Sequence, residues 1–408
     1  MTLLTVHQDN QPAPATTSPG TQTGNGTGTA TNPRPAAESD PGTQTSTGAD
    51  TGTGTGAGTA AGTTPVDPAR MPRLTTTVPR EYVHRSTLAE VFLTGCEQTG
   101  DTHYTLTAQW PRAHTFFTTP DGTHHHPLQA AETIRQTGLY LAHAELGIPL
   151  GHHFLMRNLH LTTHPQHLTI GPTPTDLTLT ATYTPHHPHT KRPTDFTMHI
   201  TITRNGHPTA TGTGRFTCLT PTTYQRLRHP HTTTGASASA SASASASASA
   251  STSASAGTHQ PPNPQPTPTP TPTHYGRTLP HDIVLTPTTH PHTWQLTPNP
   301  HHPILFDHTT DHIPGMVLLE AAHQATTAHT HPTPTTHPTH PTTHPTTLHA
   351  TFHHYTEHHT PTYITAHTTN TSDNDNDQTP TPTTHITAHQ NNTTVFTAQL
   401  TTHTPTTT

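Results

Sequence analysis

The sequence predicts an α+β fold in which one domain occurs twice, each copy an antiparallel sheet wrapped on one long helix. Each half of the chain holds one segment of helical periodicity among segments of alternating polar and apolar residues. One constant offset in numbering relates the two segments, as duplication requires. Only 26% of the 408 residues are hydrophobic and 9% are charged, so part of the chain cannot belong to a packed core.

Composition divides the chain into four parts. Residues 1–78 are mostly Thr, Gly, Ala, Pro and Ser and predict a disordered tail. Apolar residues cluster over 79–228, the first predicted domain. Alternating Ala and Ser, then a Pro-rich run, predict a flexible linker over 229–275. The second domain is expected over 276–408 with low-complexity loops, including a His-Pro-Thr tract over 329–347 that we expect not to pack.

The first domain is predicted to contain one helix among strands. Apolar residues recur at helical spacing over Pro127–Leu146, and Gly147 and Pro149 end the pattern. Asn205-Gly206 is typical of a hairpin turn. The predicted strands are Leu88–Leu93, Tyr104–Trp110, Phe154–Leu161, Leu177–Tyr183, Phe196–Ile202 and Ala210–Cys218.

The second domain repeats this plan. A helix is predicted over Pro314–His329. The predicted strands are Ile283–Leu285, Trp294–Leu296, Ala350–Phe352, Tyr363–Ala366, His385–Ala388 and Val395–Leu400. Adding 188 to a position in the first domain turns His114 into His302, Glu132 into Glu320, Gln136 into Gln324 and Arg135 into His323.

Several classes of function are disfavoured. The chain has 15 Lys and Arg, a net charge of −7 and no basic cluster, which argues against nucleic-acid binding. It has no apolar run long enough for a membrane helix, no signal-peptide pattern and only two cysteines, so we expect a cytoplasmic protein without membrane contact. The 44 His residues lie mostly in Thr-Pro-His tracts and are interpreted as solvated filler, with weak metal affinity as the alternative. No motif for a metal or nucleotide cofactor is present, and none is expected.

Glu132 is the most informative polar residue. It lies on the helix stripe that should face the sheet, and Arg135 and Gln136 follow within side-chain reach. Glu320 is placed likewise, with His323 and Gln324 after it. A carboxylate there is either a buried ion pair with a structural role or a general base tuned by burial.

Gln136, Gln324 and three other positions are weaker candidates for substrate binding. His114 and His302 each precede a predicted helix and are also explained as ordinary polar positions. Gly315 opens the second helix, where it either marks the helix start or lets a ligand carbonyl approach backbone N–H groups.

Long stretches of the chain resemble the A-factor biosynthesis hotdog family. These stretches are Val83–Thr94, Gln109–His114, Ala131–Gly138, His143–His152, Arg215–Leu219 and Leu305–Ala322. The resemblance covers about 80–228 and 276–400 and implies a tandem hotdog fold.

The resemblance implies an acyltransferase of γ-butyrolactone signal synthesis. It would move a β-ketoacyl group from acyl carrier protein to a hydroxyl of dihydroxyacetone phosphate. It also implies a catalytic Glu and Arg on each helix, here Glu132 with Arg135 and Glu320 with His323, a departure from Arg. We therefore expect the first helix to carry the main active site. The alternatives are a hotdog thioesterase or dehydratase, and a non-catalytic protein that binds an acyl ligand or carrier protein.

Overall fold

The computed structural model describes residues 2–4, 76–186, 194–228, 271–331, 345–371 and 381–402. All of them belong to one compact unit. The predicted tail over 1–78 and linker over 229–275 fall almost wholly outside the described residues and stay predictions. A short 3-10 helix, Pro272–Tyr275, is the first element after the linker and lies inside its expected range.

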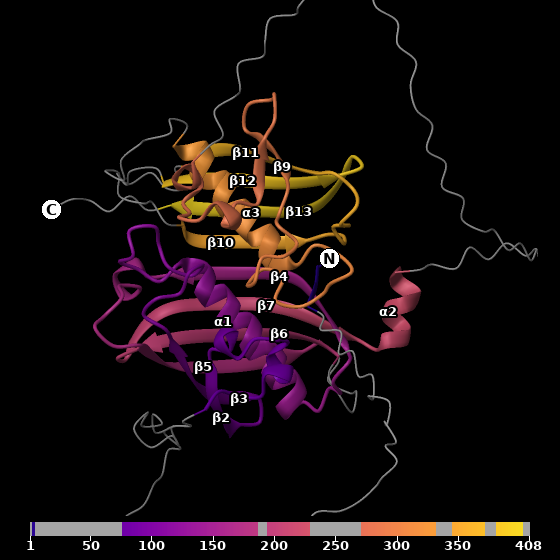
Figure 1. The fold of residues 1–408 in the computed structure, drawn as a ribbon. Coiled ribbons are helices and arrows are strands. Elements are labelled where there is room, and N and C mark those ends of the chain that lie inside the picture. Colours follow the sequence, from indigo (N-terminus) through magenta and orange to yellow (C-terminus); the bar gives the residue numbers. More distant parts are fainter. Residues whose placement is uncertain are drawn as a thin grey trace, which may run out of the picture. The chain divides into compact units, whose positions relative to one another are not determined.

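The described strands form one antiparallel sheet with two mirrored halves (Figure 1). Its order is β2-β3-β5-β6-β7-β4-β10-β13-β12-β11-β9-β8, and a short strand, β1 (Thr2–Leu4), pairs with β4. The first half comprises β2 (Leu93–Gly100), β3 (His103–Trp110), β4 (His153–Thr163), β5 (Thr175–Pro185), β6 (Asp195–Arg204) and β7 (His207–Leu219). The second half comprises β8 (Leu285–Pro287), β9 (Thr293–Leu296), β10 (Pro345–Phe352), β11 (Thr362–Thr371), β12 (Thr381–Gln390) and β13 (Thr393–Thr402).

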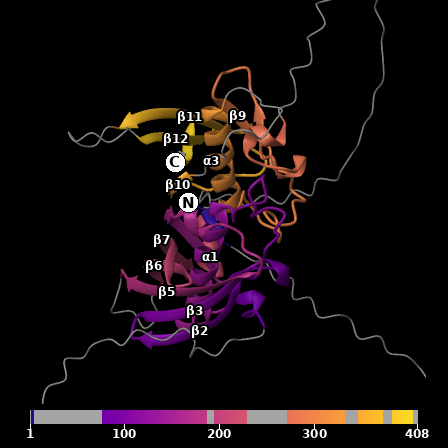
Figure 2. The same cartoon turned by 90° about the vertical axis from the view of Figure 1, so that its left-hand side faces the viewer.

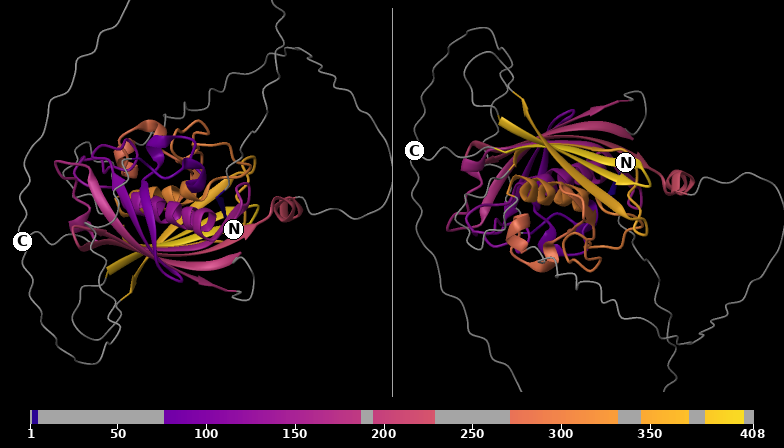
Figure 3. Two further views of the ribbon diagram at one scale, coloured as in Figure 1. Left: turned by 90° about the horizontal axis from the view of Figure 1, so that it is seen from below. Right: turned by 90° about the horizontal axis from the view of Figure 1, so that it is seen from above.

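Each half carries one long helix on the same face of the sheet (Figures 2 and 3). They are α1 (Pro127–Tyr140), extended by a π-helical turn over Leu141–Glu145, and α3 (Gly315–Thr330). A third helix, α2 (Pro221–Arg228), follows β7. The tandem arrangement of one long helix on each antiparallel half-sheet confirms the predicted fold class.

Close packing of α1 on the sheet depends on a small residue in β7. A Cβ added at Gly212 would lie 2.3 Å from Cδ1 of Ile134, a separation that real side chains do not tolerate. The helix therefore approaches the sheet closely enough to bury almost its whole length, including Glu132 and Gln136.

Two predicted strands are wrong at their start. Leu88–Glu90 is a 3-10 turn, and the strand begins only at Leu93. In the second half, β8 begins at Leu285 rather than Ile283. The physical reason is the same in both places. A glutamine side chain of the helix accepts a hydrogen bond from a backbone N–H group just before the strand. Gln136 Oε1 accepts from the N–H of Phe92 at 2.9 Å, and Gln324 Oε1 accepts from the N–H of Val284 at 3.0 Å.

The His-Pro-Thr tract also differs from expectation at its end. Residues 345–347 begin strand β10, and Pro345 is buried. The paired partners Thr347–Thr162 through Thr351–Asn158 join β10 to β4, so this segment forms the backbone junction between the two halves. The tract over 332–344 lies outside the described residues.

Candidate active site

Glu132 lies at the centre of a buried cluster of charges. Its carboxylate accepts from Nε and Nη2 of Arg135 at 2.8 and 2.9 Å and from Nε of Arg85 at 3.0 Å. Nη2 of Arg85 lies 2.6 Å from the same carboxylate, and Nε2 of Gln136 donates to it at 2.8 Å. Both arginines are buried, so one carboxylate faces two guanidinium groups out of contact with water.

The two buried arginines around Glu132 determine its protonation state. Burial alone would raise the pKa of the carboxyl group, but the charges and hydrogen bonds of Arg135 and Arg85 outweigh it and hold the pKa at about 2. A carboxylate this acidic is a weak proton acceptor at neutral pH. The arrangement therefore supports the ion-pair alternative for Glu132 and not a base with a raised pKa.

The second half repeats the cluster around Glu320. Arg277 forms a two-armed ion pair with its carboxylate, with Nε donating at 2.6 Å and Nη2 donating to the other oxygen. Nε2 of Gln324 donates to Glu320 at 2.6 Å. Because His323 stands where Arg135 does, Glu320 faces one guanidinium group and Glu132 faces two.

Arg85 and Arg277 are site residues that the sequence analysis missed. Each follows a short 3-10 helix, Arg80–Val83 or Pro272–Tyr275, and then one residue in the left-handed region, His84 or Gly276. The two arginines differ by 192 in number rather than 188, so an ungapped comparison at the first offset does not align them. Allowing a four-residue gap would have found them.

The two arginines also tie the halves together. Nη1 of Arg85 donates to the carbonyl of Ile304 at 3.0 Å, and Nη1 of Arg277 donates to the carbonyl of Phe116 at 2.5 Å. The guanidinium of Arg277 lies 4.1 Å from the centre of the Phe116 ring. Ile304 and Phe116 occupy equivalent positions, so each half closes the other's site in the same way.

His114 and His302 organise the loops that these arginines reach. Nδ1 of His114 accepts from the N–H groups of Phe116 and Phe117, and its Nε2 lies 3.3 Å from Glu90. Nδ1 of His302 accepts from two backbone N–H groups, and its Nε2 lies 3.0 Å from Asp282. Both nitrogens of each ring are engaged, so these contacts disfavour the predicted role in substrate binding.

Gln136 and Gln324 are also committed to the protein. Besides binding the Glu of its own helix, each amide donates to a carbonyl before the first strand, Glu90 at 2.6 Å and Asp282 at 2.7 Å. Their predicted contact with substrate stays a prediction, and their observed contacts position the Glu and the strand.

Arg135 and Gly315 lie on opposite helices and line one narrow cavity between the halves. Its other walls are apolar and come from both helices and both junction strands: Ala131, Met156, Leu159, Met316, Leu319 and Phe352. A second narrow cavity in the equivalent place is lined by His323, Pro127, Leu128, Leu161 and residues 345–348. There Nε2 of His323 lies 3.2 Å from Nε2 of His126.

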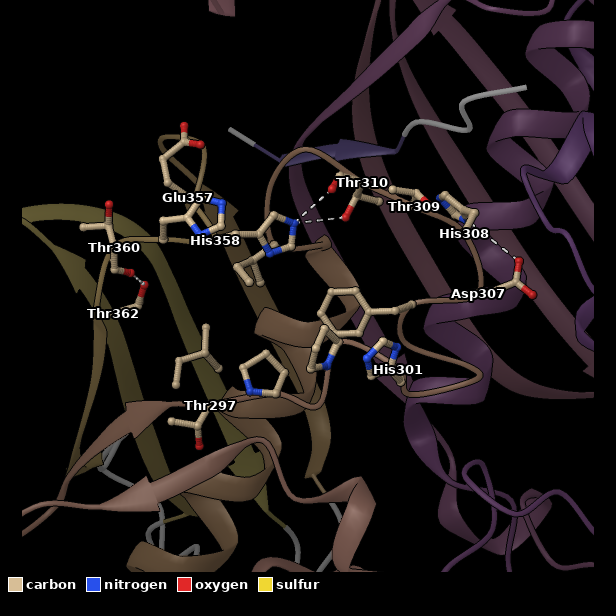
Figure 4. A pocket seen from close by; sticks show the side chains of 16 residues that line it. Thr297, His301, Asp307, His308, Thr309, Thr310, Glu357, His358, Thr360 and Thr362 are labelled. Carbon is tan, nitrogen blue, oxygen red and sulfur yellow. Dashed lines mark hydrogen bonds and ion pairs between the residues drawn. The ribbon is translucent and has the colours of Figure 1, made fainter. Parts of the chain in front are cut away.

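A larger pocket of about 860 Å³ opens in the second half (Figure 4). Asp307 and His308 form part of its wall, and Asp307 also accepts from the N–H groups of Ser86 and Thr87, next to Arg85. Burial alone would raise the pKa of Asp307, but the neighbouring His308 ring, the hydrogen bonds at Ser86 and Thr87 and the charge of Arg85 hold it below its ordinary value. The pocket thus adjoins the cluster around Glu132.

The equivalent loop of the first half is closed. Bridges pair Thr118 with His125 and His124 with Thr169, and the N–H of Ile170 donates to Thr123 at 2.8 Å. Among the described residues, the corresponding loop of the second half makes one such backbone bond, from Ile313 to Thr356 at 2.8 Å. This difference leaves the open pocket beside the Glu132 cluster.

One group of side chains among the described residues has the spacing of a metal site: His281, Asp282 and His302. Because Nδ1 of His302 accepts two backbone N–H groups, its neutral ring carries the proton on Nε2, the nitrogen that faces Asp282. A metal ion would need the lone pair of that nitrogen. The group therefore does not fit a metal ligand set. No described helix is long and apolar enough to cross a membrane.

Comparison with known proteins identifies the family. The model of the A-factor biosynthesis hotdog domain matches residues 66–220 and 259–406. A 2-oxo-3-(phosphooxy)propyl 3-oxoalkanoate synthase of Streptomyces virginiae is 38% identical over 255 residues, 62% of this chain and 78% of the relative. The enzyme of the same name from Streptomyces coelicolor is 30% identical over 257 residues, 63% of this chain and 74% of the relative.

Solved structures are more distant. A putative oleoyl thioesterase from Lactobacillus plantarum matches 75% of this chain and 98% of its own at a TM-score of 0.42 and 10% identity, too remote to bear on function. The two domain matches together span well over half of the sequence and coincide with the two halves of the sheet. The chain belongs to the A-factor biosynthesis hotdog family.

Proposed function

We propose that this protein is an acyltransferase of γ-butyrolactone signal synthesis that esterifies dihydroxyacetone phosphate with a 3-oxoacyl group. The observation that carries the proposal is the 38% identity to a 2-oxo-3-(phosphooxy)propyl 3-oxoalkanoate synthase over 78% of that enzyme. The donor is a 3-oxoacyl thioester, and we assign it to acyl carrier protein. The reaction needs a place for an acyl chain, a cation for the acceptor phosphate and a group that takes the proton of the hydroxyl.

The cluster around Glu132 supports the binding of a phosphate. Glu132 and Asp307 together balance the two guanidinium groups, so the cation that an anionic acceptor can reach is Arg135 itself rather than an excess charge of the cluster. Within the described part of the chain, Nη1 of Arg135 has no hydrogen-bond partner, while its other two nitrogens are fixed by Glu132 and the carbonyl of Val83. In this assignment Glu132 is a positioning residue that holds Arg135 and Arg85.

The cavity between the halves has a suitable lining for the donor, but at about 10 Å³ its walls must move apart before an acyl chain can enter. Its walls are apolar apart from Arg135, as an acyl chain requires. Gly315 is the first residue of α3, where backbone N–H groups have no partner within the helix. These groups would bind the thioester oxygen as negative charge develops on it.

His308 is our candidate for the general base. Burial and the neighbouring charges of Arg85 and Arg135 lower the pKa of its imidazole, which is therefore neutral at pH 7. Its Nδ1 lies 3.6 Å from Asp307, beyond hydrogen-bond distance but close enough to form the bond after a small rotation, and the residue lines the pocket. The other nitrogen then takes the proton of the acceptor hydroxyl as its oxygen attacks the thioester carbon. The C–S bond breaks, and the leaving thiolate takes the proton from His308.

The two halves contribute unequally in this proposal. Glu132 has two arginines and the open pocket, whereas Glu320 has Arg277 and lies in the half where His323 replaces the second cation. We assign the main active site to Glu132 and Arg135. The second half then completes the cavity and holds the loop at Phe116 through Arg277.

The test is a direct assay of the purified full chain. A 3-oxoacyl carrier protein and dihydroxyacetone phosphate should give the phosphorylated keto ester, and omission of the acceptor should give no product beyond slow hydrolysis. The coenzyme A thioester of the same acyl group tests the assignment of the donor. A folded protein that hydrolyses the thioester at the same rate with and without acceptor would refute acyl transfer and favour a thioesterase.

A further inference from the structure

A row of histidines crosses the face of the sheet opposite to the helices. Successive register partners place one residue of each of nine neighbouring strands in line. From β3 to β11 these residues are His103, Thr182, His199, Thr213, His160, His349, Gln399, His385 and His367. Six of the nine are histidines, and their sequence neighbours in the strands point to the buried side.

Two of these histidines meet at the junction of the halves. His160 of β4 and His349 of β10 are direct register partners, and the centres of their rings lie 3.5 Å apart. Both side chains are exposed. No other described strand pair joins the two half-sheets, because β4 and β10 alone connect them in the strand order.

We propose that His160 and His349 together bind a divalent transition-metal ion, such as Zn²⁺, Ni²⁺ or Cu²⁺, across the junction. Imidazole is a preferred ligand of these ions, with a metal–nitrogen distance of about 2.0–2.1 Å. Two nitrogens on one ion are therefore about 3 Å apart, a separation that rings 3.5 Å apart reach by side-chain rotation. Water completes the coordination on this exposed face.

The protonation state of the His160 and His349 rings suits metal binding. Burial lowers the pKa of His160, and burial together with the charge of His160 lowers the pKa of His349. At neutral pH both rings are therefore neutral and have a lone pair to donate. The register partners within the row are neutral, namely Thr213 beside His160 and Gln399 beside His349, and the nearest cation along β7, Arg215, is paired with Asp195.

The other ring contact in the row is less suitable. His367 and His385 stack with centres 4.9 Å apart, but Nε2 of His385 lies 2.9 Å from Oγ1 of Thr369 and is committed to that bond. His199 has Thr182 and Thr213 as its register partners and no histidine beside it. His199 is therefore a matched control, since it occupies the same row and face with a single imidazole.

The consequence of binding would be a link between the two halves. An ion held by one ligand from β4 and one from β10 exists only when these strands are paired. It therefore stabilises the folded chain, whereas an ion that binds the folded and the unfolded chain equally well leaves stability unchanged. Only an ion that binds the folded state preferentially raises the melting temperature.

The experiment is thermal unfolding of the full chain with EDTA, with NiCl2 and with ZnCl2. We expect saturating metal to raise the melting temperature of the wild type by about 5 °C. His160→Asn and His349→Asn should each lose this rise, and His199→Asn should keep it. Equal rises in all four proteins, or no rise in the wild type with either ion, would overturn the proposal.

Two control measurements show whether the wild type and the histidine variants can be compared. The melting temperatures of the variants in EDTA must match the wild type, and His160→Gln and His349→Gln serve as second variants if an Asn substitution does not. The acyltransfer rate in EDTA should be the same in all variants, because the row lies on the face of the sheet away from Glu132. The outcome is therefore independent of the proposed enzymatic function.

Discussion

Replacement of Glu132 by Gln is the most informative perturbation of the buried cluster. The amide keeps the shape of the side chain but removes its charge and turns one acceptor oxygen into a donor. That donor would face the N–H groups of Arg85 and Arg135, which are buried and would keep two positive charges with Asp307 alone to balance them. We expect a large loss of stability that has nothing to do with chemistry at the substrate.

The lowered pKa gives the magnitude. A fall from the ordinary value of 4.5 to about 2 corresponds to about 3 kcal/mol of stability at neutral pH, at about 1.36 kcal/mol for each pKa unit. This agrees with the roughly 3–5 kcal/mol expected when one partner of a buried ion pair is removed. Because the folded-state pKa is the lower one, this stability is present above pH 4.5 and is lost as the pH falls toward 2.

The assay is urea unfolding of both proteins at several pH values. At pH 7 the free energy of unfolding of the variant should be about 3 kcal/mol below that of the wild type. The difference should persist at pH 5 and fall below about half by pH 3. Glu97→Gln, the same change at an exposed glutamate, should alter stability by less than about 0.5 kcal/mol. A loss at Glu132 no larger than at Glu97 would refute the buried ion pair.

The remaining predictions concern activity, each with circular dichroism to show that the variant is folded. His308→Asn should lower kcat at least about 100-fold with little change in KM, and an unchanged kcat would exclude it as the base. Arg135→Lys should raise KM for the phosphorylated acceptor, because an ammonium cannot keep both contacts to Glu132; an unchanged KM in a rate titration would remove its phosphate role. Glu132→Gln should abolish turnover, while Glu320→Gln should slow it roughly fivefold, or about 1 kcal/mol. Equal losses in the two glutamate variants would contradict the asymmetry.

The parts of the fold that depend on periodicity could be predicted from the sequence. Both long helices and the strands β3 and β13 lie where the spacing of apolar residues places them, because those residues face one continuous core. The starts of β2 and β8 could not be predicted this way. There a glutamine from a distant helix binds the backbone, and periodicity carries no information about such a contact.

The candidate site likewise has one part that the sequence predicts and one part that depends on contacts between distant residues. Glu132 was recognisable as a polar residue on an apolar stripe, but its pKa depends on Arg85, which lies 47 residues earlier in the chain. Arg85 stands in a loop without periodicity, so only the tertiary structure brings it to Glu132. The expectation of a tuned base followed from burial alone, and the charges and hydrogen bonds of Arg135 and Arg85 together reverse the direction of the shift.

The doubled cluster explains how the second half keeps the fold although His323 stands at the position of Arg135. In each half the Glu has two tasks, because it holds the Gln that starts the first strand and the Arg that crosses to the other half. Arg277 alone performs the second task for Glu320, so replacement of the other arginine by His323 leaves the structure intact. Glu320 and Arg277 therefore have a structural role that does not require turnover at that site. The presence of the Glu in both copies is explained by their shared architecture, whereas the extra cation of the first half and the adjoining pocket of the second half mark the Glu132 site that we assign to chemistry.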